Sequence, residues 1–218
     1  MNKIKNVVIY GDSYSTFEGC IPKGYAPYYT KSGERMPDVK SEKSTWWHML
    51  AEELSLNIVE NNSWSGSTIS YTGRDGDCSA NSSFIFRAKQ HIEKDFLKQN
   101  NVDTVIVFGA TNDSWIDVPL GELKFSGIER EELYSVIPAI SYLVELLKGV
   151  KPEINVIYVL NSELKPEINE AVFAICEHYG VSLVELRDID KMNGHPTSIG
   201  MSQIKEQVKD CILCNTRK

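Results

Sequence analysis

The chain has no long apolar run and no excess of basic residues. Its 218 residues include 23 Lys and Arg against 30 Asp and Glu, which gives a formal net charge of -7 at pH 7. A nucleic-acid-binding face needs clustered positive charge, so this balance argues against one. No segment has the roughly 20 consecutive apolar residues that a membrane helix needs. We therefore expect neither a nucleic-acid partner nor a membrane span.

The cysteines are few and scattered. There are five, and an odd number at wide spacing does not suggest a disulfide framework. Cys211 and Cys214 form a lone CxxC without a second pair, which favours a helix end over a metal site. The basic residues at the start are followed by a strand-length apolar run and then Asp12, unlike a signal peptide. We expect a cytoplasmic protein that binds no metal.

Repeats, low-complexity runs and linkers are also absent. The hydrophobic fraction of 42% and the charged fraction of 24% are ordinary for a globular protein, so we expect one domain over residues 1–218. Apolar β-branched runs alternate with segments of helical spacing. The expected strands are 6–11, 56–62, 102–108, 154–160 and 181–186, and the expected helices are 44–54, 84–96, 129–147, 166–179 and 198–213. This alternation predicts an α/β fold, a three-layer α/β/α sandwich with a parallel sheet.

Three stretches have no clean periodicity and are expected as loops: 14–43, 71–83 and 114–128. The first is unusually long and contains several aromatic residues, among them Tyr28 and Tyr29. Loops of this length in a compact domain are usually functional. The loop either forms a wall of a pocket beside Ser13 or is a surface segment anchored by its aromatics, and both can hold.

Polar residues follow four of the five expected strands. Ser13 follows the first strand and Gly66 the second, while Asn112 follows the third and His195 the fifth. Because right-handed crossovers bring the carboxyl ends of parallel strands to one edge, we expect these four residues to meet there.

These four residues match the requirements of acyl transfer. Ser13 Oγ is a weak nucleophile that needs an adjacent base, and the imidazole of His195 is suited to that role near neutral pH. The backbone N–H groups of Ser13 and Gly66 and the side-chain amide of Asn112 can donate to an oxyanion.

Each of these residues also has a purely structural interpretation. Ser13 and Gly66 can serve tight turns, and Asn112 can cap the turn that follows it, as we expect Asp113 to do. His195, which precedes a proline, can be a loop histidine without a catalytic role. The aromatic neighbours of these residues can line a pocket or pack in the core: Tyr14, Trp64 and Trp115.

The four residues lie in short blocks, Gly11-Asp12-Ser13, Ser65-Gly66-Ser67, Gly109-Ala110-Thr111-Asn112-Asp113 and His195-Pro196. Together, and in this order, the blocks resemble those of the SGNH hydrolases, also called the GDSL esterase/lipase family. The resemblance spans nearly the whole chain. It implies a flavodoxin-like five-stranded parallel sheet in the order 2-1-3-4-5. It also implies ester hydrolysis without a cofactor or metal.

One position departs from the family pattern. The family usually has an Asp three residues before the catalytic His, and Met192 occupies that position here. The nearest acids are Asp190 and Asp188. We expect Asp190 to orient His195, provided that residues 191–194 bulge. The alternative is that a backbone carbonyl orients the imidazole and leaves a Ser–His dyad.

The leading hypothesis is a serine esterase or acylhydrolase. It removes an acyl group, such as acetyl, from a small or carbohydrate-like ester substrate through an acyl-enzyme. The second hypothesis is a flavodoxin-like protein that binds flavin or phosphate with the hydroxyl-rich turn after the first strand. The third, motivated by Met192, is a non-catalytic carbohydrate-binding relative.

Overall fold

A computed structural model describes residues 4–151 and 153–215. Its main sheet contains five strands, β1 (Asn6–Gly11), β2 (Asn57–Ser63), β5 (Thr104–Gly109), β6 (Asn155–Leu160) and β7 (Ser182–Glu185). All neighbours pair in parallel, in the order β2-β1-β5-β6-β7. Numbered along the chain, these five strands have the order 2-1-3-4-5. The predicted α/β fold class and sheet order are therefore confirmed.

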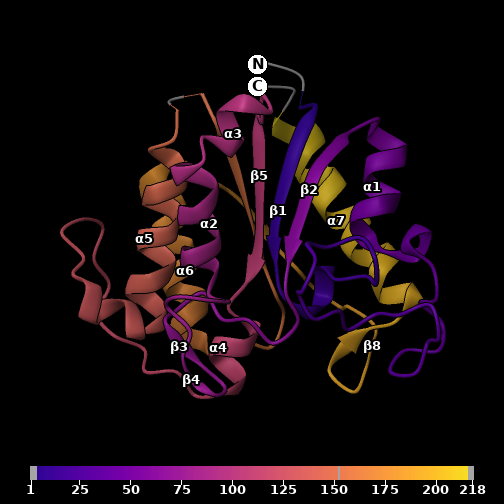
Figure 1. The fold of residues 1–218 in the computed structure, drawn as a ribbon, viewed down its shortest axis with the longest axis horizontal. Coiled ribbons are helices and arrows are strands. Elements are labelled where there is room, and N and C mark those ends of the chain that lie inside the picture. Colours follow the sequence, from indigo (N-terminus) through magenta and orange to yellow (C-terminus); the bar gives the residue numbers. More distant parts are fainter. Residues whose placement is uncertain (1–3, 152, 216–218) are drawn as a thin grey trace.

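Helices cover both faces of this sheet (Figure 1). On one face lie α1 (Trp46–Leu54) and α7 (Ser198–Asn215), and on the other lie α2 (Phe84–Glu93), α5 (Val136–Lys148) and α6 (Pro166–Tyr179). The shorter helical elements are α3 (Phe96–Gln99), α4 (Thr111–Trp115), η1 (Ser13–Ser15), η2 (Glu42–Ser44) and η3 (Arg130–Tyr134). Two small hairpins complete the fold, β3 (Thr72–Gly73) with β4 (Gly76–Asp77), and β8 (Lys191–Met192) with β9 (His195–Pro196).

The side chains of β1 show how the sheet supports two cores. Val7 and Ile9 point into the cluster that includes α1 and α7, and Val8 and Tyr10 point into the cluster that includes α2, α5 and α6. Successive side chains of a strand point to opposite faces, so an uninterrupted apolar run is buried on both sides. This double burial fixes the register of β1 and hence the position of Ser13 at its end.

Two predicted helices are interrupted. The helix predicted over 84–96 ends at Glu93, and Asp95, in the left-handed region at φ 53°, separates it from α3. The helix predicted over 129–147 divides into η3 and α5. Pro138 is the third residue of α5, in the first turn, where N–H groups have no intrahelical partner. Proline therefore costs little there and does not kink the helix.

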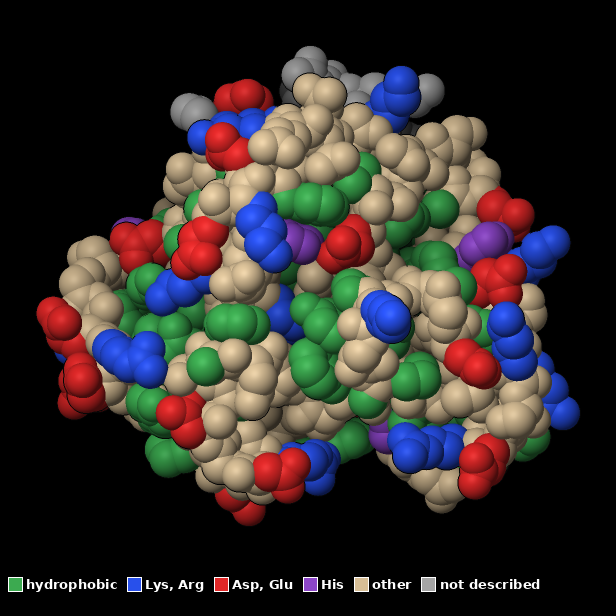
Figure 2. All heavy atoms as spheres, viewed as in Figure 1, with side chains coloured by type: hydrophobic (Ala, Val, Ile, Leu, Met, Phe, Trp, Pro, Cys, Tyr) green, Lys and Arg blue, Asp and Glu red, His purple; other side chains and the backbone are tan. Residues whose placement is uncertain are grey.

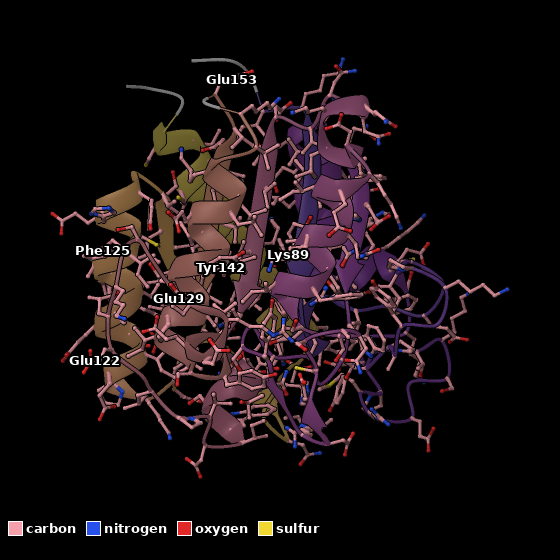
Figure 3. The ribbon with its side chains drawn as sticks, turned by 60° about the vertical axis from the view of Figure 1, so that its left-hand side comes forward. Lys89, Glu122, Phe125, Glu129, Tyr142 and Glu153 are labelled. Atoms are coloured by element: carbon pink, nitrogen blue, oxygen red, sulfur yellow. The ribbon has the colours of Figure 1, made fainter. Side chains whose placement is uncertain are left out.

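The stretches predicted as loops include further local structure. Residues 71–83 contain the β3–β4 hairpin, which the sequence interpretation missed. Phe125, in the stretch 114–128, stacks on His178 of α6 with ring centroids 4.1 Å apart. The helices of this layer also contact one another. The Nζ atom of Lys89 on α2 lies 4.9 Å from the ring centroid of Tyr142 on α5 (Figure 3). These contacts secure the helical layer around α5.

The surface carries acidic and basic side chains in an interspersed pattern on the face in Figure 2. Among the described residues, no helix is both long and apolar enough to cross a bilayer.

Cys211 and Cys214 both lie in the last turns of α7, as the sequence predicted.

The polar blocks gather at one edge of the sheet. The arrowheads of β1 and β5 point to this edge, and both small hairpins lie beside it (Figure 1). The long loop from residue 16 to residue 41 also runs along this edge, where Phe17, Tyr28 and Tyr29 are buried. The loop is thus anchored by its aromatics, and Tyr28 also reaches the candidate site.

Candidate active site

Ser13 occupies a sharp turn directly after β1. The Asp12 carboxylate accepts a hydrogen bond of 3.0 Å from the Tyr14 N–H and so caps the turn Ser13–Ser15. A Cβ on Gly11 would lie only 2.4 Å from Ser63 Oγ, so only glycine fits where β1 enters the turn. This tight passage holds the Ser13 side chain at the carboxyl edge of the sheet, where it is 3% exposed.

His195 reaches Ser13 from the other end of the chain. Its Nε2 lies 3.0 Å from Ser13 Oγ, across a separation of 182 residues. Its Nδ1 lies 3.1 Å from the carbonyl oxygen of Asn193. A carbonyl can only accept a hydrogen bond, so Nδ1 donates, and in the neutral ring Nε2 is left as an acceptor for the Ser13 hydroxyl. This is the tautomer that a general base needs.

The surroundings of His195 favour its neutral form. Burial is the main cause that lowers the pKa of His195 below its usual value of 6.5. The Asn193 carbonyl acts in the opposite direction, and the positive charges of Arg35, Lys191 and Arg74 lower the pKa further. At neutral pH the imidazole is therefore mostly unprotonated and able to accept a proton.

The structure does not bring Asp190 to His195. The Asp190 carboxylate accepts a hydrogen bond from Thr197 Oγ1, and the Asp190 N–H donates to Gln203 Oε1 at 2.7 Å. The expected bulge over residues 191–194 is instead a tight hairpin in which Met192 pairs with His195. Its two turn residues, Asn193 and Gly194, have φ of 51° and 75°, as in a type I′ turn. This turn leaves Asp190 outside and directs a backbone carbonyl to Nδ1.

Three aromatic side chains hold the hairpin and the imidazole. Tyr14 Oη donates to the Gly194 carbonyl, and Tyr29 Oη donates to the Pro196 carbonyl at 2.8 Å. The ring of Tyr28 stacks on the imidazole of His195, with centroids 3.6 Å apart and planes inclined by 5°. These contacts fix the orientation of the His195 imidazole, a task that a carboxylate partner performs in a full triad.

Gly66 and Asn112 are connected through Ser67, the residue after Gly66. Gly66 has φ 83°, and a Cβ there would meet open space, so glycine serves the backbone conformation. Within residues 4–151 and 153–215, its N–H makes no hydrogen bond. Asn112 Nδ2 donates to the Ser67 carbonyl at 3.0 Å, which ties the amide to the Gly66 turn. Asp113 accepts from the N–H groups of Ile69 and Ser70 at 2.9 and 3.0 Å, a structural role that joins distant segments in place of the local cap that we expected.

Comparison with known proteins identifies the family of this chain. The model of the family described as GDSL-like Lipase/Acylhydrolase matches residues 5–212. The chain belongs to this family. The resemblance in the sequence blocks is thus confirmed, and family membership supports a hydrolase that acts on esters.

Solved structures agree. A protein from Bacteroides ovatus described as a GDSL-like lipase is 40% identical over 100% of both chains, with a TM-score of 0.87. A second, from Bacteroides uniformis, is 37% identical over 96% of both chains, with a TM-score of 0.86. An acetyl xylan esterase from Butyrivibrio proteoclasticus has a TM-score of 0.60 at 15% identity, over 98% of this chain and 64% of its own. That likeness shows the fold alone. No curated protein matches this chain.

Arg87 is a residue of this GDSL-like protein that the sequence interpretation missed. It is 1% exposed and donates to the Gly11 carbonyl at 3.2 Å and to Ser67 Oγ at 3.1 Å. It also donates to Asn62 Oδ1 at 2.9 Å. One guanidinium thus connects the end of β1, the end of β2 and the Gly66 turn. Burial lowers its pKa to about 10, which leaves it charged at neutral pH.

A signal for Arg87 was present in the sequence. Buried side chains of α2 recur at Phe84, Ala88 and His91, and Arg87 lies on the same face of the helix. An arginine on an apolar face indicates a buried group with dedicated partners. The identity of those partners depends on residues 11, 62 and 67, which no pattern within the helix reveals.

Asp12, in the block Gly11-Asp12-Ser13, is a second buried ionisable side chain near the site. Burial is the main cause that raises the pKa of Asp12 to about 7, and the hydrogen bond from the Tyr14 N–H lowers it only in part. The buried carboxyl of Asp113 raises it further. The side chain beside the proposed nucleophile therefore titrates near neutral pH.

Asp12→Asn is expected to stabilise the protein more at pH 8 than at pH 5. An unfolded carboxyl titrates near pH 3.9 and the folded one near 7, so wild-type stability falls as the pH rises through this window. Asn keeps an acceptor for the Tyr14 N–H and cannot ionise. The free energy of unfolding of the variant relative to wild type should rise by about 2–3 kcal/mol between pH 5 and pH 8.

Denaturant titrations at both pH values measure this difference. The control is Asp117→Asn, because the hydrogen bond from Lys165 lowers the pKa of the exposed Asp117 carboxyl. The Asp117 carboxyl stays ionised between pH 5 and pH 8, so Asp117→Asn should change the free energy of unfolding by the same amount at both pH values. An equally constant effect for Asp12→Asn would show that Asp12 does not titrate in this range.

Proposed function

We propose that this protein is a serine esterase in which Ser13 and His195 form a catalytic dyad. The observation that carries the proposal is the 3.0 Å contact between Ser13 Oγ and His195 Nε2. The imidazole is stacked, buried and held in the tautomer that accepts a proton. A serine that served only the turn would not need a base at this distance.

The reaction proceeds in two halves. Ser13 Oγ attacks the acyl carbon while His195 Nε2 takes the hydroxyl proton, and a tetrahedral oxyanion forms. The C–O bond to the alcohol then breaks, and His195 gives its proton to the departing oxygen. Water repeats the sequence on the acyl-enzyme, with His195 as base, and releases the acid and free Ser13. No step requires a metal or cofactor.

The oxyanion is stabilised by N–H groups from three segments of the chain. The backbone N–H groups of Ser13 and Gly66 and the second Nδ2 hydrogen of Asn112 are the proposed donors. Support comes from the Gly66 N–H, which has no partner in the described residues, and from the bond that ties Asn112 to Ser67. Removing one such donor typically costs on the order of 10²–10³ in rate.

The proposed dyad differs from a full triad in its third member. The carbonyl of Asn193 replaces a carboxylate at Nδ1, so it fixes the tautomer but contributes no full negative charge to an imidazolium. Tyr28, stacked on the ring, and the tyrosine hydroxyls that hold the hairpin restrict its rotation. Orientation by packing therefore compensates for the missing Asp.

A polar hollow beside the site suggests the substrate. It measures about 360 Å³ and is lined by the segment from Trp64 to Thr68 and by the β3–β4 hairpin. The lining contains hydroxyl, amide, charged and backbone groups, and Trp64 adds an aromatic surface that stacks on Tyr25. A small or carbohydrate-like ester, with acetyl as a candidate acyl group, suits such a lining better than a long acyl chain.

The proposal predicts that a fluorophosphonate probe labels the folded protein at Ser13. Peptide mass spectrometry locates the label, and Ser13→Ala should remove it. Heat-denatured protein is the matched control, because the nucleophile is activated only in the folded site. Labelling is expected to persist in EDTA, since His195 alone activates the serine. Folded protein that takes no label would contradict the proposal.

Two alternatives are tested by the same preparation. A flavin-binding protein would be purified yellow, whereas the esterase is colourless. A non-catalytic carbohydrate-binding relative would not turn over p-nitrophenyl acetate. Family membership and the Ser13–His195 contact favour the esterase over both.

A further inference from the structure

The charged side chains that contribute most to lowering the pKa of His195 are positive, although the chain has a net charge of -7. They come from three separate segments: Arg35 from the long loop, Arg74 from the turn of the β3–β4 hairpin, and Lys191 from β8. An acidic protein that surrounds its reactive centre with cations attracts anions to that centre.

Lys191 is already neutralised. Its Nζ lies 3.2 Å from the Glu163 carboxylate and donates to Ser162 Oγ at 2.8 Å. Lys191 therefore attaches the His195 hairpin to the loop after β6. The two arginines differ from it, because in the described part of the chain neither Arg35 nor Arg74 forms an ion pair. Both are exposed.

Arg74 is the better placed of the two. Its Nη2 donates to Asn112 Oδ1 at 3.3 Å, so the guanidinium lies beside the proposed oxyanion donors. It also lines the 360 Å³ hollow together with Gly66 and Ser67. Arg35 does not line this hollow, and its guanidinium carbon lies 5.6 Å from the ring centroid of Tyr28.

The hairpin that carries Arg74 is anchored to the body. Thr72 Oγ1 donates to the Tyr134 carbonyl at 2.8 Å before the turn. After the turn, the Asp77 carboxylate accepts from Tyr134 Oη at 3.0 Å and from the Ser79 N–H at 2.8 Å. The backbone of Arg74 is therefore held from both sides.

Two acids also line the hollow. The Asp77 carboxylate is occupied by the hydrogen bonds above, and Asp75 lies at the exposed turn. Neither forms an ion pair with Arg74 among the described residues. Their negative charge repels an anion, so an anionic group in the hollow has to lie against the Arg74 guanidinium, which contacts Asn112.

We propose that the substrate of this site is an ester that carries a carboxylate or similar anionic group, and that Arg74 binds this group in the hollow beside Gly66 and Asn112. A guanidinium matches a carboxylate with two parallel N–H donors and is the preferred partner for such recognition. The inference rests on the proposed esterase function and specifies its substrate class.

Two matched substrate pairs test the inference, one for each side of the ester. On the alcohol side, 4-acetoxybenzoate is compared with neutral 4-acetoxybenzamide. On the acyl side, the mono-p-nitrophenyl ester of glutaric acid is compared with p-nitrophenyl 5-oxohexanoate, in which a methyl group replaces the carboxylate oxygen. The measured quantity is the ratio of kcat/KM for the anionic ester to that for its neutral partner, after subtraction of uncatalysed hydrolysis.

Arg74→Gln is expected to lower this ratio about tenfold for at least one pair, mainly through a higher KM for the anionic ester. Arg74→Lys retains the charge and should retain part of the preference. Arg130→Gln is the matched control, since Arg130 donates to Ser79 near the same hairpin but does not line the hollow. The wild-type ratio should also fall with added salt, because exposed charges are screened.

The outcomes separate the two proposals. If neutral esters are hydrolysed in a Ser13-dependent manner and the ratio for both pairs is the same in wild type and Arg74→Gln, the anion inference is overturned. If no ester is hydrolysed with dependence on Ser13, the esterase proposal itself fails. Should Arg74→Gln not fold, a wild-type ratio that is insensitive to salt for both pairs overturns the inference.

Discussion

His195→Ala is expected to lower kcat/KM for p-nitrophenyl acetate by at least about a thousandfold, because it removes the base that contacts Ser13. Asp190→Asn is expected to change it by less than about threefold. The Asp190 carboxylate accepts from Thr197 and does not meet the imidazole, and Asn keeps an acceptor there. The difference between these two variants measures how much catalysis depends on a third, acidic residue.

The pH profile separates catalytic from structural effects of these variants. In wild type, the acidic limb of kcat/KM should lie below pH 6.5, because burial lowers the pKa of His195. Activity should rise through this limb as the imidazole loses its proton and then reach a plateau. Asp190→Asn should leave the limb in place. A hundredfold loss in Asp190→Asn with unchanged stability would show that the hairpin opens during turnover and that Asp190 joins a triad.

Arg87→Met is expected to destabilise the protein by about 3–5 kcal/mol, among the largest effects for a single substitution. Methionine fills much of the volume but donates no hydrogen bond. The Gly11 carbonyl, Asn62 Oδ1 and Ser67 Oγ lose their common donor, and a buried polar group without its partner is costly. Urea unfolding at pH 7 measures the loss.

The matched control is Lys94→Met, which removes a positive charge from an exposed position just after α2 and should cost less than about 0.5 kcal/mol. Arg87→Met should also lower kcat in the fraction that folds, because Gly11 and Ser67 position the nucleophile and the Gly66 turn. An effect on stability below 1 kcal/mol would contradict the description of Arg87 as the common donor of three chain segments.

Some parts of the site were predictable because they depend on local sequence pattern. The apolar run of β1 is followed at once by polar residues, so Ser13 was placed at the carboxyl edge of a parallel sheet. The same rule placed Gly66, Asn112 and His195. Helix ends with strong signals were also predicted well, as for α6, which begins at Pro166 and ends before Gly180.

Other parts required contacts between distant segments. Tyr28 stacks on His195, which is 167 positions away in the sequence. Tyr28 itself lies in a loop without periodicity, so no pattern predicts the contact. The partners of Arg87 lie 20, 25 and 76 residues away. Such contacts depend on how a turn directs a side chain, and no period of apolar residues records that direction.

The sequence pattern by itself determined the α/β sandwich and placed four polar residues at one edge of its sheet. These follow from the period of burial and from the handedness of strand crossovers, whereas the strand order was implied by the resemblance of the sequence blocks to the SGNH hydrolases. Only the tertiary structure decided the partner of His195 Nδ1. The type I′ turn at Asn193 and Gly194 directs a carbonyl, and not Asp190, to the ring. That choice depends on backbone angles and on the tyrosines that hold the hairpin, and neither can be read from residue spacing.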